Sequence, residues 1–391
     1  MDEVRNPYVP GAGRTPAALV GRDKELRAWQ VALERIQQGA SAQPLALYGL
    51  RGVGKTVLLN RMRQEAEYRD WITAKVEAAT GKPLRESLGE ALHAPLSDLA
   101  QPSAGKRLVR ALKTALSFRA SYDATGTWNL GIDLQEATGG GADSGVLETD
   151  LTKLVRDLSG AAGERHVGLA ILVDEAQDLA DDEIAALCAV VHEAAQRDWS
   201  FTLALTGLPS LPGILAEAKS YAERQFVYYS IGNLPTATSI DALVLPARDA
   251  GNVSWDDDAA QHVVTEAGGY PYYLQQHGQE AWNEASGNSI TLPDARVGVV
   301  RGTTALDNGF FRSRWDRATR AEQEYLRAMA ADGDAGSQSG EVAQRLDRKL
   351  SSLGPARANL ISKGLIYSPE HGRIAFTVPR MASFIQRQPT D

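Results

Sequence analysis

The stretch Gly49-Leu50-Arg51-Gly52-Val53-Gly54-Lys55-Thr56 directly follows a short apolar run at residues 45–48. It matches the pattern G-x-x-x-x-G-K-[ST], in which a strand turns through a glycine-rich loop into a helix. The glycines let successive backbone N–H groups point at one anion, and the helix macrodipole adds positive potential there. The stretch therefore predicts a phosphate-binding loop between a buried strand and a helix. The alternative is a plain glycine-rich turn that carries Lys-Thr by chance.

Two side chains of this loop have specific expected roles. We expect Lys55 to reach the β- and γ-phosphates of a bound nucleotide, and Thr56 to bind Mg²⁺ through its hydroxyl. The candidate nucleotide contacts of the loop and of the first helical turn are Gly49, Arg51, Gly52, Val53, Gly54, Lys55, Thr56 and Val57.

A second motif follows about 120 residues downstream, where the apolar run 167–173 ends in Asp174 and Glu175. Continuous hydrophobicity of this length is typical of a central parallel strand that is covered on both faces. At the end of such a strand we expect Asp174 to hold Mg²⁺ through water, and Glu175 to orient and deprotonate an attacking water. The alternative is a buried strand that is followed by two acidic residues without a catalytic role. Together with the loop, the acidic pair predicts hydrolysis of a nucleoside triphosphate.

Two further positions are candidate catalytic residues. The strand expected at 201–206 ends at Thr206, which we interpret as a sensor of the γ-phosphate and attacking water; the alternative is a strand-ending threonine before a turn. Arg224 precedes the strand expected at 226–231 and could stabilise transition-state charge, in cis or across a subunit boundary. An exposed helix-terminal arginine that complements the helix dipole explains Arg224 equally well.

The composition is that of an ordinary soluble globular protein, with 43% hydrophobic and 23% charged residues in a chain of 391. This length accommodates two or three domains. We expect a cytoplasmic protein without a membrane partner, because there is no apolar run of membrane-spanning length and no signal-peptide pattern at the N-terminus. The single cysteine, Cys188, excludes a disulfide within the chain and is expected to be buried.

The order of helical and strand patterns predicts an α/β fold, a P-loop NTPase parallel sheet with a helical lid and a C-terminal winged-helix domain. Within the core, alternating apolar residues at 128–134 predict a β-hairpin, and the glycine-rich run 139–145 predicts a flexible tether. The expected parts are a flexible N-terminus at 1–18, a core at 19–233 with an insertion at about 79–146, a lid at 234–300 and the winged helix at 301–391.

The last ninety or so residues contain three helical patterns followed by two short apolar strands with a tight turn between them, as in a winged helix. Residues 301–391 carry 14 Lys and Arg against 10 Asp and Glu (+4), which leaves 27 against 39 (−12) for residues 1–300. If the protein binds DNA, this charge contrast favours the C-terminal part as the binding region. Protein interaction or autoinhibition is the alternative use of this domain. The candidate DNA contacts are Arg357, Asn359 and Lys363 on the expected recognition helix, and Arg373 on the wing.

With these residues in hand, the chain resembles the AAA+/STAND group of P-loop ATPases, in particular the archaeal-type and origin-recognition-like ATPases that end in a winged helix. The motifs that carry the resemblance are Val20-Gly21-Arg22, residues 49–56, Asp174-Glu175, Thr206-Gly207, Arg224 and Gly269-Tyr270-Pro271. The resemblance implies ATP as the nucleotide. It also implies that Val20, Gly21, Arg22 and Pro271 contact the adenine.

One feature departs from the origin-recognition proteins, which usually carry an arginine in the lid that senses the γ-phosphate. Here the lid offers Gly-Tyr-Pro at 269–271 instead, which favours the STAND-like side and weakens assignment as a replication initiator. The insertion at about 79–146 lies where initiator-type ATPases place extra helices, so that alternative stays open.

The main hypothesis is a Mg²⁺-dependent ATPase that binds ATP and ADP and works as a switch, with its nucleotide state coupled to the winged helix. One alternative is an ATP-controlled DNA-binding regulator, or an initiator or loader, that contacts double-stranded DNA through the winged helix. Another is a signalling or defence scaffold that is autoinhibited by its winged helix and acts through a protein partner or a homo-oligomer.

Overall fold

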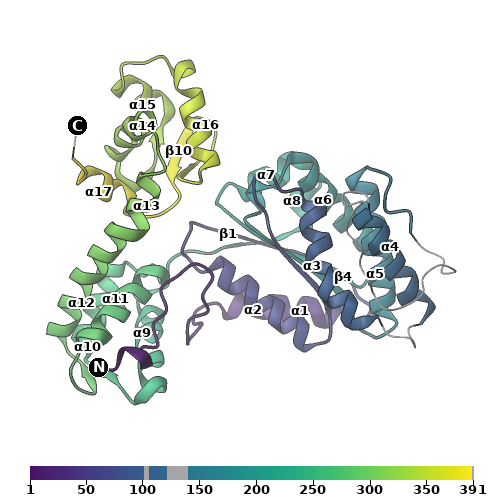
Figure 1. Ribbon diagram of the computed structural model, residues 1–391, viewed down its shortest axis with the longest axis horizontal. Helices are drawn as coiled ribbons and strands as arrows, with labels where there is room; N and C mark the ends of the chain where they lie inside the picture. The colour runs from purple at the N-terminus through teal and green to yellow at the C-terminus, as the bar shows by residue number, and fades with distance from the viewer. Residues whose placement is uncertain (101–104, 121–139, 390–391) are drawn as a thin grey trace.

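The computed structural model describes residues 1–100, 105–120 and 140–389. Figure 1 shows three parts in chain order: a core with a sheet, a lid of helices, and a C-terminal domain that a long helix joins to the lid. The hairpin expected at 128–134 lies outside the described residues, as does the first glycine of the run 139–145.

The core contains one sheet of five parallel strands in the order β2-β3-β4-β1-β5. The central strands β3 and β4 are buried along their whole length, whereas the edge strand β5 is partly exposed. This pattern agrees with the expectation that continuous apolar runs form central strands. The strands are β1 (Leu45–Tyr48), β2 (Ile72–Glu77), β3 (Leu169–Asp174), β4 (Phe201–Gly207) and β5 (Val227–Ser230).

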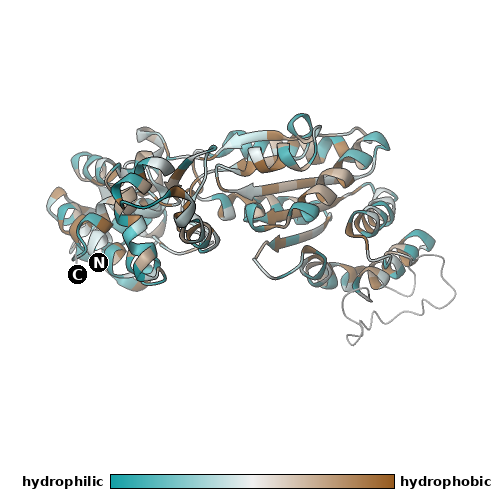
Figure 2. Ribbon diagram, turned by 90° about the horizontal axis from the view of Figure 1, so that it is seen from above, coloured by the Kyte–Doolittle hydropathy of each residue, from teal (hydrophilic) through white to brown (hydrophobic). Residues whose placement is uncertain are grey.

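Side chains of each strand point alternately to the two faces of the sheet, and each face has its own apolar cluster. Leu45 and Leu47 belong to one cluster, while Ala46 between them belongs to the other. Figure 2 shows apolar residues along the strands and polar residues on the outward sides of the helices. Helices α1 (Asp23–Gln37) and α2 (Lys55–Tyr68) cover the first face. The second is covered by α3 (Leu84–Leu99), α4 (Lys106–Ala120), α5 (Leu147–Gly163), α6 (Asp181–Gln196), α7 (Leu211–Ala218) and the short α8 (Ala222–Gln225).

The lid follows β5 and packs beside the P-loop end of the sheet. It contains α9 (Thr236–Gly251), α10 (Asp257–Ala267), α11 (Pro271–Glu284) and α12 (Leu292–Ala305), with two-residue strands β6 (Ser254–Trp255) and β7 (Ser289–Ile290). Helix α12 crosses residue 300, where we expected the lid to end.

The N-terminal segment packs on the lid. Apart from the short 3-10 helix η1 (Glu3–Arg5), residues 1–22 form no helix or strand. The ring of Tyr8 is nevertheless fully buried, and its hydroxyl donates a hydrogen bond to Leu243 O and accepts one from Trp255 Nε1. The segment is therefore held along the lid and leads to the nucleotide loop.

The C-terminal domain is joined to α12 by residues 306–315, which we call the connector. The connector is a π-helical segment, η3 (Leu306–Phe311), that continues into α13 (Arg312–Trp315). The domain then contains α14 (Arg320–Ala330), η4 (Gly333–Ala335), β8 (Ser337–Gln338), α15 (Ser339–Arg345), η5 (Leu350–Leu353), α16 (Gly354–Ser362), β9 (Ile366–Tyr367), β10 (Arg373–Phe376) and α17 (Met381–Gln386). Helices α14, α15 and α16 together with a small antiparallel sheet, in the order β8-β10-β9, fit a winged-helix-like domain.

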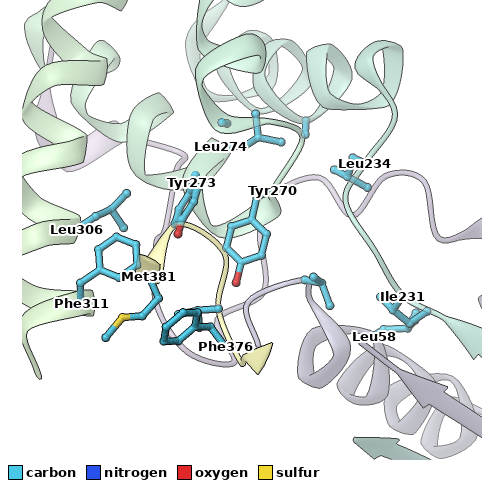
Figure 3. Packing of buried hydrophobic residues seen from close by; sticks show 14 of the residues in the cluster. Leu58, Ile231, Leu234, Tyr270, Tyr273, Leu274, Leu306, Phe311, Phe376 and Met381 are labelled. Carbon is cyan, nitrogen blue, oxygen red and sulfur yellow. The ribbon is translucent and has the colours of Figure 1, made fainter. Parts of the chain in front are cut away.

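The core, lid and C-terminal domain share one apolar cluster. Figure 3 shows Leu58 from the core, Tyr270 and Leu274 from the lid, and Phe376 and Met381 from the C-terminal domain in this cluster. Because these side chains are buried together, the C-terminal domain is packed against the other two parts. Among the described residues, no helix has both the length and the apolar character that a membrane span requires.

Candidate nucleotide-binding and catalytic site

The predicted phosphate-binding loop joins β1 to α2 at the carboxyl edge of the sheet. Gly54 forms the N-cap of α2 with φ of 93°, and Gly52 has φ of 85°. These left-handed conformations favour glycine because it has no Cβ. A Cβ on Gly52 would also collide with the hydroxyl of Tyr270, so the lid approaches the loop too closely for any larger residue.

Lys55 lies at the first position of α2 and its side chain is almost completely buried. Its ammonium donates hydrogen bonds to two carbonyls of its own loop, Gly49 O at 3.0 Å and Leu50 O at 2.9 Å. Burial lowers the pKa of Lys55, while the nearby carboxylates of Glu175 and Asp174 act in the opposite direction. The ammonium is therefore in the loop where phosphate oxygens would replace the two carbonyls.

The acidic pair lies at the end of β3, next to the end of β4. The carboxylate of Asp174 is buried and accepts a hydrogen bond from the Thr206 hydroxyl, which is itself fully buried. The neighbouring order β3-β4 thus places Thr206 against Asp174. The roles of Asp174 in metal binding and of Thr206 as a sensor stay predictions.

Glu175 adopts a left-handed backbone conformation with φ of 51° and ψ of 40°. Such a conformation is costly for a non-glycine residue and is frequent at functional sites. Its carboxylate accepts a hydrogen bond from Gln177 Nε2 at 2.7 Å and forms a salt bridge with Arg51 at 3.2 Å. The predicted base is therefore held by two side chains, one of which belongs to the phosphate-binding loop.

Arg51 connects the loop to both other parts of the protein. Its backbone N–H donates to Thr377 O in the C-terminal domain at 3.0 Å, and its carbonyl accepts a hydrogen bond from the Tyr270 hydroxyl of the lid. Its guanidinium also lies against Gly364, where an added Cβ would be 2.9 Å from Arg51 Nη2. One loop residue thus contacts the Glu175 carboxylate, the lid and the C-terminal domain.

A cavity of about 220 Å³ lies over the loop, between the core, the lid and the connector. It is lined by most of the residues predicted to bind nucleotide or to catalyse: Val20, Arg22, Arg51, Gly52, Val53, Gly54, Lys55, Thr56, Val57, Glu175 and Pro271. The remaining candidates, Gly21, Gly49, Asp174, Thr206 and Arg224, do not line it.

Arg22 and Gly21 have structural contacts that explain their positions. The Arg22 guanidinium is buried and donates to Val53 O at 3.1 Å and Gly232 O at 2.7 Å, so it ties the loop to the segment that enters the lid. Burial lowers the pKa of Arg22. Gly21 has φ of 70°, and a Cβ there would lie 2.5 Å from Thr238 Cγ2. Contact of either residue with an adenine stays a prediction.

Arg224 lies near the amino-terminal ends of the strands, whereas the loop follows the carboxyl end of β1. It belongs to α8, is exposed, and its carbonyl accepts a hydrogen bond from Gln43, just before β1. Since β1 spans four residues, about 13 Å of strand separate Arg224 from the loop. The structure therefore does not bring Arg224 to the site in cis, and a role across a subunit boundary stays a prediction.

Three of the four candidate DNA contacts are engaged within the C-terminal domain. The Lys363 ammonium binds the buried carboxylate of Glu322 at 2.5 Å, Arg357 donates to Ser368 Oγ at 3.1 Å, and Arg373 donates to Ala335 O at 2.8 Å. Asn359 is exposed on α16. Contact of these residues with DNA stays a prediction.

Several residues of the site were not among the predicted ones. The N-terminal segment contributes residues 9–14 with Pro16, Ala18 and Leu19, the lid contributes Tyr272, and the connector contributes Phe310 and Arg314. The connector residues follow the loop by more than 250 positions and carry no local motif, so sequence spacing gave no signal for them. Tyr270 could have been predicted from the sequence, because it lies between the glycine and the proline of the lid motif.

Two family models match parts of the chain. Residues 18–203 match the AAA ATPase domain, and residues 308–385 match a domain of unknown function, DUF8462. No curated protein matches the sequence.

Solved structures with a similar fold cover nearly the whole chain. The Walker-type ATPase Paby2304 of Pyrococcus abyssi matches with a TM-score of 0.58 and 17% identity over 94% of this chain and 96% of that one. Cdc6p of Pyrobaculum aerophilum matches with a TM-score of 0.47 and 14% identity over 99% and 97%. The ORC1 protein of Aeropyrum pernix, solved in complex with DNA, matches with a TM-score of 0.48 and 16% identity over 98% and 96%. At these identities the match to Paby2304 shows a shared fold alone.

Proposed function

Because residues 18–203 form an AAA ATPase domain and the chain is therefore an ATPase, we propose that it works as a nucleotide-controlled switch. In this proposal ATP occupies the cavity over residues 49–56, and its binding and hydrolysis control the docking of the C-terminal domain. The observation that carries the proposal is the position of Arg51, which contacts Glu175 and Thr377 at the same time.

Glu175 is the proposed general base for the attacking water. In the described conformation Arg51 and Gln177 both contact the same carboxylate oxygen, Glu175 Oε2, at 3.2 Å and 2.7 Å. A base must reach the proton that it abstracts within hydrogen-bond distance. We propose that the docked C-terminal domain holds Arg51 against Glu175, and that undocking releases the carboxylate for catalysis.

Mg²⁺ is the proposed metal cofactor. Thr56 lines the cavity, and the buried Asp174 lies at the end of β3, which β4 separates from the loop-bearing strand β1, so the site offers two hard oxygen donors for this ion. Within the described residues, no group of three or more His, Cys, Asp or Glu forms a metal site by itself. This fits an ion held by one or two protein oxygens together with nucleotide phosphates, whose charge it would neutralise.

The docking surface offers a direct test. Arg380 of the C-terminal domain donates to Glu266 O at the end of α10, and its guanidinium carbon lies 5.5 Å from the centre of the Tyr273 ring. Arg380→Gln removes the charge that makes both contacts strong. We expect steady-state ATP turnover to rise by a factor on the order of 10, since a charged hydrogen bond across the docking surface is lost.

Arg348→Gln is the matched control, because Arg348 is exposed on the same domain and lies 3.8 Å from Glu324 of that domain. Its turnover should equal that of the wild type. A rise with Arg348→Gln of the same size, or none with Arg380→Gln, would contradict control by docking.

Duplex DNA is a second candidate partner, favoured by the charge of +4 on residues 301–391 against −12 on residues 1–300. A shift of duplex DNA by the full chain that weakens steeply with salt would support it. The Asn359→Ala variant should weaken that shift if the exposed face of α16 meets DNA. Absence of any salt-dependent shift, with and without ATP, would exclude this partner.

A second copy of the chain is a third candidate partner. Arg224 is exposed and lies far from the phosphate-binding loop of the same chain, so it could reach this loop only in another subunit. If Arg224 acts across a subunit boundary, a slowly hydrolysed ATP analogue should increase the molecular mass in solution. Arg224→Ala should then keep nucleotide binding and lose turnover. A monomer under all nucleotide conditions would leave no role for Arg224 in catalysis.

A further inference from the structure

The connector brings one arginine into the nucleotide cavity. Arg314 of α13 lines the cavity together with Arg51, Lys55, Thr56 and Glu175. It is distant from the loop in sequence and belongs to neither the core nor the lid. A cationic side chain in this place requires an explanation, because burial of a charge without a partner is costly.

The Arg314 guanidinium is held in position by its own connector. Nη1 donates to Phe310 O at 2.7 Å, and the guanidinium carbon lies 3.9 Å from the centre of the Phe310 ring. The Phe310 ring in turn stacks on Tyr272 of the lid, with ring centres 4.8 Å apart. The stack therefore fixes the direction of Arg314 before any ligand binds.

Part of the guanidinium has no partner. Arg314 Nε is buried and, among the described residues, makes no hydrogen bond; the same holds for Nε of Arg51. A smaller or less polar side chain could also pack on the Phe310 ring and donate one hydrogen bond to the Phe310 carbonyl. A planar donor set with unused N–H groups at a phosphate loop suits an anion with several oxygens.

The charges around the cavity point the same way. Burial lowers the pKa of Arg314, and the neighbouring guanidiniums of Arg51 and Arg317 lower it further. Lys55, Arg51 and Arg314 thus bring three cations to one cavity, where the lining carboxylate of Glu175 is paired with Arg51. A bound triphosphate would relieve this repulsion.

We infer that Arg314 binds the terminal phosphates of the nucleotide, so that the connector itself contributes a ligand of the ATPase site. The inference rests on the proposed function, because it requires nucleotide in this cavity. It adds a physical link: an ion pair between the phosphates and Arg314 acts directly on the helix that leads into the C-terminal domain. Loss of the γ-phosphate on hydrolysis would weaken that pair.

Nucleotide titration of the full chain tests the inference. Arg314→Ala should weaken binding of a slowly hydrolysed ATP analogue by about 10- to 100-fold, the range of a charge-assisted hydrogen bond. Binding of ADP should weaken less, and AMP least, because AMP lacks the terminal phosphates. Arg314→Lys should restore part of the affinity, since it keeps the charge and loses the planar donors.

Arg317→Ala is the matched control, because it removes an equal charge from an exposed residue that follows α13 and does not line the cavity. Its affinities should equal those of the wild type, which separates direct contact from long-range attraction. The thermal shift that the ATP analogue produces provides a second measurement, and it should shrink with Arg314→Ala while the unfolding midpoint without nucleotide stays the same.

Three results would overturn the inference. They are wild-type affinity for the ATP analogue in Arg314→Ala, equal losses for the analogue and AMP, and no difference between Arg314→Ala and Arg317→Ala. If Arg314→Ala does not fold, Arg314→Lys is measured in its place. An equal loss of affinity for the ATP analogue, ADP and AMP in Arg314→Lys would then overturn the inference. Failure of the proposed function is distinguishable, because the wild type would then bind no ATP and Lys55→Ala would change nothing.

Discussion

The guanidinium of Arg51 lies 3.2 Å from the carboxylate of Glu175, while the backbone N–H of the same Arg51 donates to Thr377 O. The first contact reaches the proposed catalytic base, and the second reaches the C-terminal domain. Since both involve one residue of the phosphate-binding loop, a change in the docking of that domain changes the environment of the base without any intermediate element.

The first prediction concerns the base itself. Glu175→Gln should retain ATP binding and lower turnover by about 10²- to 10⁴-fold, the usual contribution of a general base. Glu193→Gln serves as the control, because Glu193 pairs with Arg197 on the surface of α6. Binding and single-turnover hydrolysis measured on both variants check the prediction. Turnover by Glu175→Gln at the wild-type rate would remove Glu175 from the mechanism.

The second prediction concerns the partner of the base. Arg51→Ala should raise basal turnover several-fold, because it frees the Glu175 carboxylate and removes the side chain that packs on Gly364. Arg63→Ala is matched in charge and removes an exposed pair with Glu67 on α2, so its turnover should not change. Steady-state hydrolysis at saturating ATP measures both. A large loss of turnover with Arg51→Ala would instead give Arg51 a direct part in catalysis.

The third prediction separates backbone strain from close packing. Gly52→Ala should abolish nucleotide binding, because the added Cβ meets the Tyr270 hydroxyl and pushes the lid from the loop. Gly39 also has a positive φ, of 78°, but a Cβ there meets nothing within 4 Å. Gly39→Ala should therefore cost about 1–2 kcal/mol of stability and leave nucleotide affinity unchanged. Calorimetric titration and urea unfolding of the two variants distinguish these effects.

The fourth prediction is a pH dependence of stability. Burial, helped by the charges of Arg380 and His262, lowers the pKa of His277 from 6.5 to about 4. Between these two values the unfolded chain binds the proton and the folded chain does not, so folding becomes less favourable as the pH falls. The contribution of neutral His277 to the free energy of unfolding is fully present above pH 6.5. On the order of 3 kcal/mol of this free energy is lost once the pH reaches 4.

Urea unfolding at pH 7 and pH 5 measures this effect. The wild type should lose stability between the two values, and His277→Gln should lose clearly less, because glutamine does not titrate. An identical loss in both proteins would mean that His277 does not bind a proton on unfolding.

Much of the fold could be predicted from local patterns. Residues 167–173, before Asp174, are apolar throughout, and residues 201–205, before Thr206, are apolar except for Thr202; such runs are typical of buried strands in a parallel sheet. The positions of Lys55 and Glu175 at one cavity followed from the rule that parallel strands end at the same edge.

The rest depends on contacts between parts that are far apart in the chain. Nothing in the neighbourhood of Arg314 or Thr377 indicates that either residue lies at the loop, because their positions follow from how the connector packs on the lid. Likewise, Arg224 was a candidate by its order along the chain, but its place before β5 puts it at the opposite edge of the sheet.

Hydrogen exchange of the full chain tests the proposed switch most directly. A slowly hydrolysed ATP analogue should increase exchange in peptides that cover residues 364–380, because the segment with Thr377 leaves the loop, and Lys55→Ala should show no such change. Unchanged or reduced exchange of these peptides at saturating analogue would show that the C-terminal domain stays docked when nucleotide binds, and would contradict the switch.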